Sequence, residues 1–227
     1  MNHQPGEPQA WDQHWRALEG RSQLFGRIAS LVRRQVLARA VRHFTDRYFP
    51  RRGLFVEAGC GTSESSWRMQ RLERTLVGID FSLAALCAAR RLGRFDGVVC
   101  ADIRHLPFAD GVVSGIWNLG VMEHFAPATV AEILDELRRV CREQAIILLF
   151  WLPSFGLSRW VLGPLEWFKS RNGRPAFRFF PDEVNRLSSR RAARLTMAAS
   201  GLELLRADFT LRDGFNHLIL VARKPAR

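Results

Sequence analysis

Three acidic residues each follow a short apolar run in the first half of the chain. Glu57 is the acid of LFVEA, Asp80 ends TLVGID, and Asp102 follows GVVCA. Two glycines, Gly59 and Gly61, come directly after the first of these runs. Glycine lets a backbone turn sharply and come close to a ligand, and a carboxylate accepts hydrogen bonds from hydroxyl or amino groups. The pattern therefore predicts a site for a nucleoside-like ligand.

The spacing of the acids indicates which parts of the ligand they meet. Asp80 lies 23 residues beyond Glu57, where its carboxylate could accept both hydroxyls of a ribose, and Asp102 could accept from an adenine amino group. A dinucleotide is the alternative, but its G-x-G-x-x-G pattern puts the third glycine at Glu64. A carboxylate at a helix start is unfavourable for a pyrophosphate. An adenosine site is therefore favoured.

The elements that must position these residues alternate along the chain. Apolar runs predict strands over 54–58, 75–80, 97–101, 112–119, 145–152, 202–209 and 215–223, and helical patterns predict helices over 22–48, 63–73, 82–93, 127–141 and 182–200. Strands that alternate with helices favour βαβ units and a parallel sheet. Only TLRDG separates the last two strands, so they predict a hairpin and an antiparallel last strand. The expected fold is α/β, a doubly wound sheet of seven strands with helices on both faces.

Two segments depart from this rhythm. Residues 1–50 predict an N-terminal helical extension that could act as a lid, and residues 51–227 predict one domain. Within that domain, residues 153–180 read as an irregular insertion rich in tryptophan and phenylalanine.

Composition limits the possible partners without naming one. The formal net charge is +12, yet the arginines are spread along the chain with no block of five or six. A basic surface suits nucleic acid or an anionic membrane, so both stay open as alternatives. The four cysteines lack zinc-site spacing, and no metal site is expected. The polar start and the short longest apolar run, AIILLFWL, predict a cytoplasmic protein.

Four motifs in order amount to a family resemblance. VEAGCGTS, GIDFS, ADIRHLPFADG and GIWNLGVMEHF resemble the class I S-adenosylmethionine-dependent methyltransferases, and among them the type 11 subgroup of small-molecule methyltransferases. The resemblance covers about residues 54–150 in motif and 54–223 in strand order. It departs at Ser63, where the family has a third glycine, and at Val113-Ser114, where Phe-Asp is usual.

The resemblance implies a Rossmann-like fold and S-adenosylmethionine as the cofactor. It assigns the cofactor contacts by matched position: the methionine end to Glu57, Gly59, Cys60, Gly61 and Ser63, the ribose to Asp80, the adenine to Phe81, Asp102 and Ile103, and the sulfonium to Asn118, Leu119 and Gly120. Methyl transfer is an in-line displacement that needs alignment, exclusion of water and at most one base.

His124 is the candidate general base, because imidazole titrates near neutral pH. A role in shaping the turn stays open for it, and His217 is expected to serve packing or to be exposed. The resemblance places the insertion over 153–180 on the acceptor side of the site. Acceptor contacts are therefore expected from aromatic residues: Trp11 and Trp15 near the N-terminus, then Trp151, Phe177 and Phe180.

The expected function is methyl transfer to oxygen, nitrogen or activated carbon of a small or medium-sized acceptor. The alternatives are a nucleic-acid substrate, or a lipid or lipid-linked glycan at a membrane surface.

Overall fold

The computed structural model describes residues 11–12, 15, 30–155 and 183–226. These residues form a sheet of seven strands in the order β3-β2-β1-β4-β5-β7-β6. β1 to β5 are parallel, and β7 runs antiparallel to both of its neighbours. The strands are β1 (Arg52–Ala58), β2 (Glu73–Asp80), β3 (Gly97–Cys100), β4 (Val113–Leu119), β5 (Cys141–Trp151), β6 (Glu203–Phe209) and β7 (Leu218–Arg223). The fold class predicted from the sequence is confirmed.

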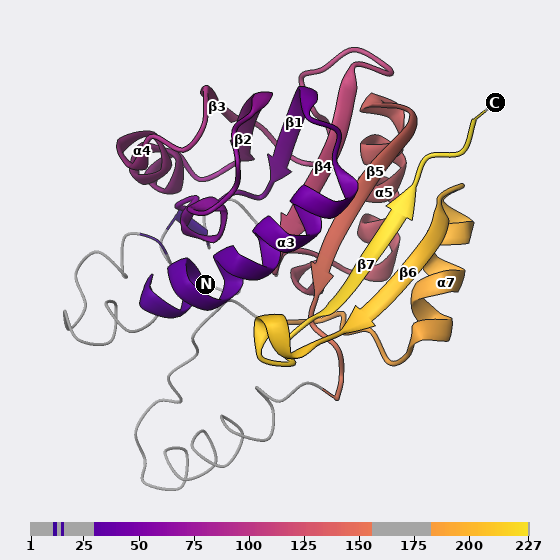
Figure 1. Ribbon diagram of the computed structural model, residues 1–227. Helices are drawn as coiled ribbons and strands as arrows, with labels where there is room; N and C mark the ends of the chain where they lie inside the picture. Colours follow the sequence, from indigo (N-terminus) through magenta and orange to yellow (C-terminus); the bar gives the residue numbers. More distant parts are fainter. Residues whose placement is uncertain (1–10, 13–14, 16–29, 156–182, 227) are drawn as a thin grey trace, which may run out of the picture.

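Helices cover both faces of this sheet (Figure 1). The helices are α3 (Ala38–Tyr48), α4 (Leu83–Leu92), α5 (Pro127–Val140) and α7 (Arg190–Ala199), and the shorter turns are η1 (Arg33–Leu37), η2 (Glu64–Ser66), η3 (Met122–His124) and η4 (Leu211–Asp213). Successive strand residues point to opposite faces. Phe55 and Phe150 therefore pack under α3, whereas their neighbours Val56 and Leu149 pack under α5 and α7.

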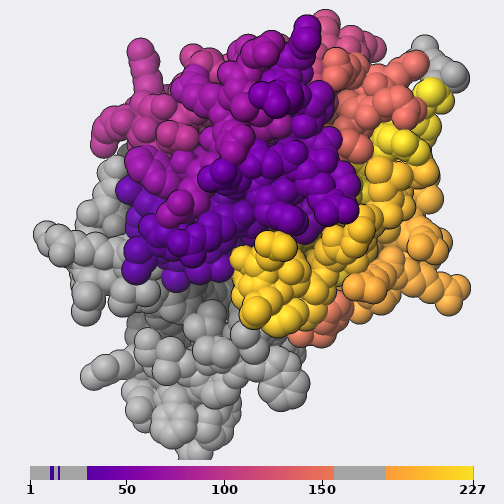
Figure 2. Space-filling model, viewed as in Figure 1, coloured from indigo at the N-terminus to yellow at the C-terminus, as the bar shows by residue number. Residues whose placement is uncertain are grey.

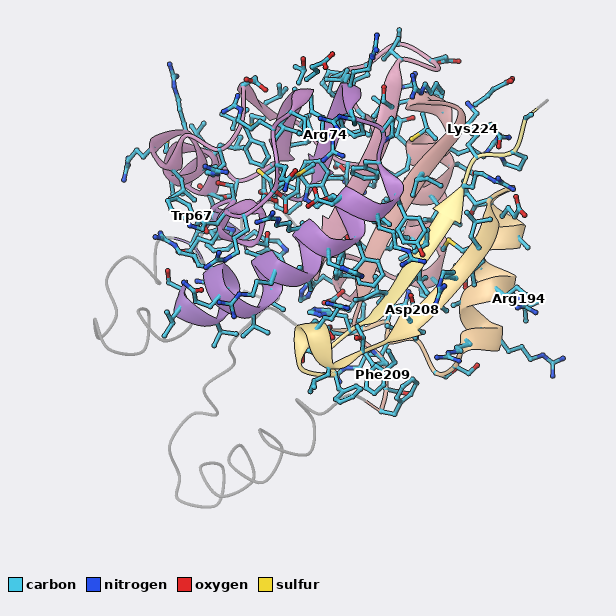
Figure 3. All side chains as sticks on the ribbon, viewed as in Figure 1. Trp67, Arg74, Arg194, Asp208, Phe209 and Lys224 are labelled. Atoms are coloured by element: carbon cyan, nitrogen blue, oxygen red, sulfur yellow. The ribbon has the colours of Figure 1, made fainter. Side chains whose placement is uncertain are left out.

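The strand order reverses between β1 and β4. From β1, the chain adds β2 and β3 on one side, and it then adds β4 and β5 on the other side. Doubly wound sheets bind ligands at the carboxyl ends of the strands beside such a reversal. The antiparallel β7 begins at this same edge, so the segment from η4 to its first residue lies there too (Figure 1). In the space-filling view the surface of α3 adjoins that of the η4 turn (Figure 2). Phe209, the last residue of β6, is also at this edge (Figure 3).

The helix predicted over 63–73 is wrong. Its place is taken by the single 3-10 turn η2, and Ser63 before it has a left-handed φ of 61°. Ser65 and Ser66 donate their hydroxyls to the Glu57 carboxylate at 3.0 and 2.6 Å. Serine side chains that bond elsewhere in this way offer the backbone an alternative to a regular helix.

The helix predicted over 182–200 begins later, at Arg190. Ser189 caps it, because its hydroxyl accepts from the backbone N of Ala192 at 3.1 Å. The described residues before the cap, 183–188, form no helix, and Leu187 forms a bridge with Pro153. Among the described residues, no helix is long and apolar enough to cross a membrane.

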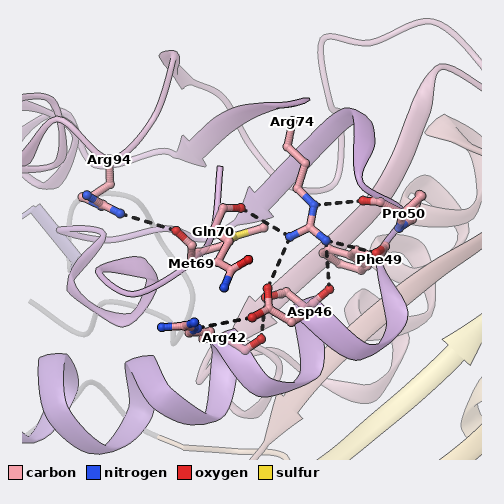
Figure 4. A network of polar contacts seen from close by, with 9 residues as sticks. Arg42, Asp46, Phe49, Pro50, Met69, Gln70, Arg74 and Arg94 are labelled. Carbon is pink, nitrogen blue, oxygen red and sulfur yellow. Dashed lines mark hydrogen bonds and ion pairs between the residues drawn. The ribbon is translucent and has the colours of Figure 1, made fainter. Parts of the chain in front are cut away.

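Arg74 on β2 fastens α3 to the sheet (Figure 4). Its side chain is 1% exposed and forms an ion pair with Asp46 of α3 at 3.7 Å. Its guanidinium also donates to four backbone carbonyls, those of Pro50 at 2.9 Å, Phe49 at 3.0 Å, and Thr45 and Gln70 at 3.3 Å. A buried guanidinium is tolerated only when its donors are satisfied. This network therefore fixes the C-terminal end of α3 beside the start of β1 and β2.

Candidate functional site

A cavity of about 450 Å³ lies at the carboxyl edge of the sheet. It is lined from five strand ends: Gly59 after β1, Asp80 at the end of β2, Gly120 after β4, Leu152 after β5 and His217 before β7. Small-molecule sites typically enclose roughly 300–1,000 Å³. The cavity therefore has the size and the place expected for a ligand of nucleoside dimensions.

The glycine loop leaves no room for larger side chains. A Cβ at Gly59 would lie 2.6 Å from a methyl group of Val121, and one at Gly61 would lie 2.9 Å from the ring of Trp15. Both glycines have positive φ, 76° and 50°, which glycine adopts without steric cost. The backbone N atoms of Gly59 and Cys60 each donate to the carbonyl of Ile79 at 2.8 Å. The loop is thus pinned to β2 while its backbone faces the cavity.

Asp80 is held in place by backbone donors. Its Oδ2 accepts from the N of Gly61 at 2.9 Å, and its Oδ1 accepts from the N of Ser82 at 2.9 Å. Burial raises the pKa of this carboxyl, and the hydrogen bonds from Ser82 and Gly61 work in the opposite direction. The carboxylate thus links the glycine loop to the start of α4 and lines the cavity between them.

Glu57 is turned away from the cavity. Its two oxygens accept from Ser65 and Ser66, and the Ser66 hydroxyl in turn accepts from the indole N of Trp117 at 3.0 Å. The residue is 1% exposed, and burial raises its pKa to about 7. Glu57 therefore shapes the loop from beneath, and it does not line the cavity.

The N-terminal segment covers the loop. Trp15 lies against Gly61, and the rings of Trp11 and Trp15 are stacked with centroids 6.3 Å apart. Trp11 also meets His124 edge-on, with ring centroids 4.8 Å apart. Asp12 accepts from the hydroxyl of Ser82 at 2.5 Å. Because these contacts reach both the β1 loop and the start of α4, the two tryptophans close one side of the cavity.

A paired acid forms another part of the wall. Glu64 accepts from the Nε atoms of Arg33 at 2.7 Å and Arg34 at 3.1 Å, and also from Ser30. Burial would raise the pKa of Glu64, but the hydrogen bonds from Ser30 and Arg33 outweigh it and the pKa is lowered. The two arginines belong to η1, a π-helical turn, and such turns are frequent at functional sites.

Comparison with known proteins identifies the domain. Residues 56–149 match the family model described as a methyltransferase domain. Over these residues the chain is similar to a methyltransferase domain. These residues include the end of β1 and all of β2, β3 and β4, on both sides of the reversal, together with most of β5.

One curated relative is the Encephalitozoon cuniculi (strain GB-M1) protein named "Putative methyltransferase ECU09_1500", which is 32% identical over 119 residues. The match covers 52% of this chain, and the chain spans about half the length of that relative, 54%.

Solved structures share the fold of the methyltransferase domain. Magnesium protoporphyrin IX methyltransferase from Synechocystis PCC 6803, solved with bound SAH, has a TM-score of 0.64 at 18% identity over 93% of each chain. Burkholderia thailandensis 1,6-didemethyltoxoflavin-N1-methyltransferase has a TM-score of 0.63 at 15% identity, over 100% of this chain and 94% of its own. At these identities the likeness shows the fold alone.

The cavity gathers most of the residues predicted from the sequence. Its lining includes the predicted cofactor residues Gly59, Cys60, Gly61, Asp80, Phe81, Ile103, Leu119 and Gly120, together with His124, Trp11 and Trp15. Their roles stay predictions, but their proximity is a property of the fold.

Four predicted cofactor residues do not line the cavity: Glu57, Ser63, Asp102 and Asn118. Asp102 pairs with the guanidinium of Arg104 at 2.6 Å, which lowers the pKa of Asp102 against the effect of burial. Asn118 donates to the carbonyl of Ala58 at 2.5 Å, so it joins β4 to the end of β1.

The predicted acceptor wall differs as well. Trp151 is 1% exposed, packs in the core and donates its indole N–H to the carbonyl of Asn185 at 3.0 Å. It does not line the cavity, because the last residue of β5 points to the face covered by α5 and α7. Phe177, Phe180 and the insertion from residue 156 onward lie outside the described residues.

Sequence reasoning missed two features of the cavity. Glu123 and Glu183 line the cavity, and burial raises the pKa of Glu123 to about 8. His217 also lines it, and its Nδ1 lies 3.0 Å from Oδ2 of Asp213. The available signal was the run DGFNH, in which an acid and a histidine four residues apart flank the start of the last strand. Alternation with apolar neighbours instead suggested packing or exposure for His217.

Proposed function

We propose that the protein transfers a methyl group from S-adenosylmethionine to oxygen, nitrogen or activated carbon of a small or medium-sized acceptor. The geometry of Asp80 carries this proposal. A carboxylate offers about four acceptor sites, and hydrogen bonds from Gly61 and Ser82 occupy one on each oxygen. The remaining capacity matches two neighbouring hydroxyls, as on a ribose.

Other residues at the cavity fit the rest of the cofactor. Phe81 and Ile103 lie close to Asp80 along the lining and offer apolar surfaces for an adenine ring. Gly59 and Gly61 keep the first loop free of side chains where the methionine part would lie. When bound, the cofactor supplies an electrophilic methyl group on a positively charged sulfur. The protein's own tasks are to bind, to orient and to exclude water.

The acceptor end is the part of the cavity formed after β4 and β5 and before β7, where Glu123, Leu152 and His217 lie. The Synechocystis enzyme is named for a porphyrin and the Burkholderia enzyme for a toxoflavin precursor. These relatives support a small-molecule acceptor. In this proposal residues 1–50 form a covering extension, and residues 51–227 form the methyltransferase domain with an acceptor-side insertion at 153–180.

The test is calorimetric titration with S-adenosylmethionine. Asp80→Ala should weaken binding by more than tenfold, because it removes a pair of charge-assisted hydrogen bonds to the ribose. Asp110→Ala is the matched control, since its carboxylate is 80% exposed and pairs with Arg139. Thermal unfolding verifies that both variants are folded. Equal affinity of Asp80→Ala and the wild type for S-adenosylmethionine would refute the proposal.

A nucleic-acid acceptor is the second candidate, and a groove on the outer side of α3 favours it. The groove encloses about 520 Å³ and is lined by Arg39, Arg42, His43, Asp46, Arg47 and Arg68. Phosphate contacts by arginine make affinity fall steeply with salt. Binding of a generic RNA or DNA that weakens many-fold between 50 and 200 mM salt would support this candidate, and no binding at low salt would remove it. The lipid alternative depends on the insertion, which lies mostly outside the described residues.

A further inference from the structure

His217 occupies the acceptor end of the cavity. β2, which carries Asp80, and β7, which follows His217, are separated by β1, β4 and β5. Four strand spacings of about 4.8 Å put these strands roughly 19 Å apart. Both residues line the one cavity. A nucleoside anchored at Asp80 would therefore leave the end beside His217 for the methyl acceptor.

The imidazole of His217 is oriented by a buried carboxylate. Oδ2 of Asp213 lies 3.0 Å from Nδ1 of His217 and also accepts from the backbone N of His217 at 2.7 Å. The two side chains are 4% and 0% exposed. An ionised carboxylate only accepts hydrogen bonds, so beside it Nδ1 carries the proton and Nε2 is the ring's acceptor.

Two neighbouring side chains contact the His217 imidazole. The side-chain amide nitrogen of Asn216 lies 3.4 Å from Nε2 of His217, and Asn216 lines the cavity as well. The ring of Phe150 on β5 meets the imidazole edge-on, with centroids 6.3 Å apart. Because an amide nitrogen donates, this arrangement agrees with Nε2 as an acceptor. The pair has the geometry of a base held by an orienting acid.

We propose that His217 is the general base of methyl transfer, that Asp213 is its positioning residue, and that the acceptor is a phenol or a heteroaromatic N–H compound. The proposal rests on the proposed function. The acceptor atom forms a bond to the methyl carbon, and the carbon–sulfur bond breaks with its electron pair going to sulfur. The acceptor proton moves to Nε2 of His217. The products are the methylated acceptor, a neutral thioether and an imidazolium that Asp213 stabilises.

The base selects the acceptor class. A carboxylic acid is already ionised at neutral pH and gains nothing from a base. A phenol or a heteroaromatic N–H must lose its proton to become a good nucleophile, and its acidity is close enough to that of imidazole for effective general-base catalysis.

Other titratable groups face the same space and belong to separate elements. They are Arg33 with its partner Glu64, Glu123 and His124 on η3, Glu183 before α7, and Asp80. Next to η4, α3 carries His43, whose pKa is lowered by burial and by Arg212 and Arg47. His124, in edge-on contact with Trp11, is the competing base. The experiment must therefore separate His217 from His124.

The experiment measures methyl transfer from tritium-labelled S-adenosylmethionine to a panel of phenols, heteroaromatic N–H compounds, primary amines and carboxylic acids. The wild type should methylate a phenol or a heteroaromatic N–H compound, with a rate that rises with pH. His217→Asn should lower kcat by roughly 10²- to 10⁴-fold and abolish this rise. Its affinity for S-adenosylmethionine and its KM for the acceptor should stay within about threefold. The kcat of Asp213→Asn should lie between that of the wild type and that of His217→Asn.

His105→Asn is the matched control, since His105 is exposed and does not line the cavity. It should keep the wild-type rate. Should His217→Asn fail to fold, His217→Gln takes its place. Retention of more than a tenth of kcat in the His217 variant, or loss of the pH rise in His124→Asn instead, overturns the proposal. A wild type that binds S-adenosylmethionine but methylates only amines or acids, or no panel member, also overturns it. A wild type that does not bind S-adenosylmethionine refutes the proposed function instead.

Discussion

The clearest quantitative prediction concerns Glu123 and the pH dependence of stability. Burial raises the pKa of this carboxyl from 4.5 to about 8, and the nearby charge of Glu183 acts in the same direction. Above pH 4.5 the unfolded chain loses this proton, whereas the folded protein keeps it up to about pH 8. The group therefore lowers the free energy of unfolding as pH rises through this window.

The magnitude follows from the two pKa values. Each pH unit between them costs about 1.4 kcal/mol, so the roughly 3.5 pH units amount to a loss on the order of 5 kcal/mol by pH 8. Glu123→Gln has the same shape and no charge at any pH. We expect its free energy of unfolding to lie within about 1 kcal/mol of the wild type at pH 5 and to exceed it by several kcal/mol at pH 8.

Urea unfolding followed by circular dichroism at pH 5 and pH 8 measures both values. The quantity to compare is the change in stability between the two pH values, because any packing effect of the amide is common to both. Glu143→Gln, an exposed change on β5, should retain the pH dependence of the wild type. If Glu123→Gln also retained it, Glu123 would be ionised in the folded protein, and burial would not dominate its environment.

Three further substitutions test the glycine loop, the Arg74 network that holds α3 to the sheet, and the contact of Trp15 with Gly61. Gly59→Ala puts a Cβ 2.6 Å from Val121 at a φ of 76°, so it should cost about 1–3 kcal/mol in urea unfolding; an unchanged midpoint would mean that the loop is free to move. Arg74→Met leaves four carbonyls without their donor and should lower the free energy of unfolding by about 3–5 kcal/mol in the same assay. A loss below 1 kcal/mol would show that the Arg74 network does not hold α3 to the sheet. Trp15→Ala uncovers Gly61, so S-adenosylhomocysteine should dissociate several times faster in stopped-flow fluorescence; an equal rate would show that Trp15 does not cover the ligand.

The sheet could be predicted from the sequence because its strands are buried on both faces and read as continuous apolar runs. Errors occurred where side chains compete with the backbone for hydrogen bonds. Ser65 and Ser66 bond to Glu57 in place of continuing a helix, and Ser189 caps α7 later than the apolar pattern suggests. Such local bonds depend on a partner that another element supplies, so their residues look ordinary in the sequence.

The residues of the site likewise include some that the sequence could predict and others that it could not. Asp80 and the glycines could be predicted, because Asp80 ends a strand, the glycines come shortly after one, and the carboxyl ends of parallel strands share an edge. The pairing of Asp213 with His217 could not, since it depends on the path of the chain through η4. Trp151 was expected at the acceptor but packs in the core, and the sequence does not show this because the two faces of a strand buried on both sides look alike.

The charge of the cavity is opposite to that of the chain. The formal net charge is +12, yet the lining contains the acids Glu64, Asp80 and Glu183, beside a Glu123 that burial keeps protonated up to about pH 8. Among the described residues, the lining has only Arg33 as a permanent cation. Net charge therefore describes the outer surface and says little about the ligand. An acid-rich cavity with few compensating cations favours a positively charged ligand over a phosphate. S-adenosylmethionine carries its positive charge on the reacting sulfur and loses it on transfer, so the same acids that support binding of the donor would hold the neutral product less firmly.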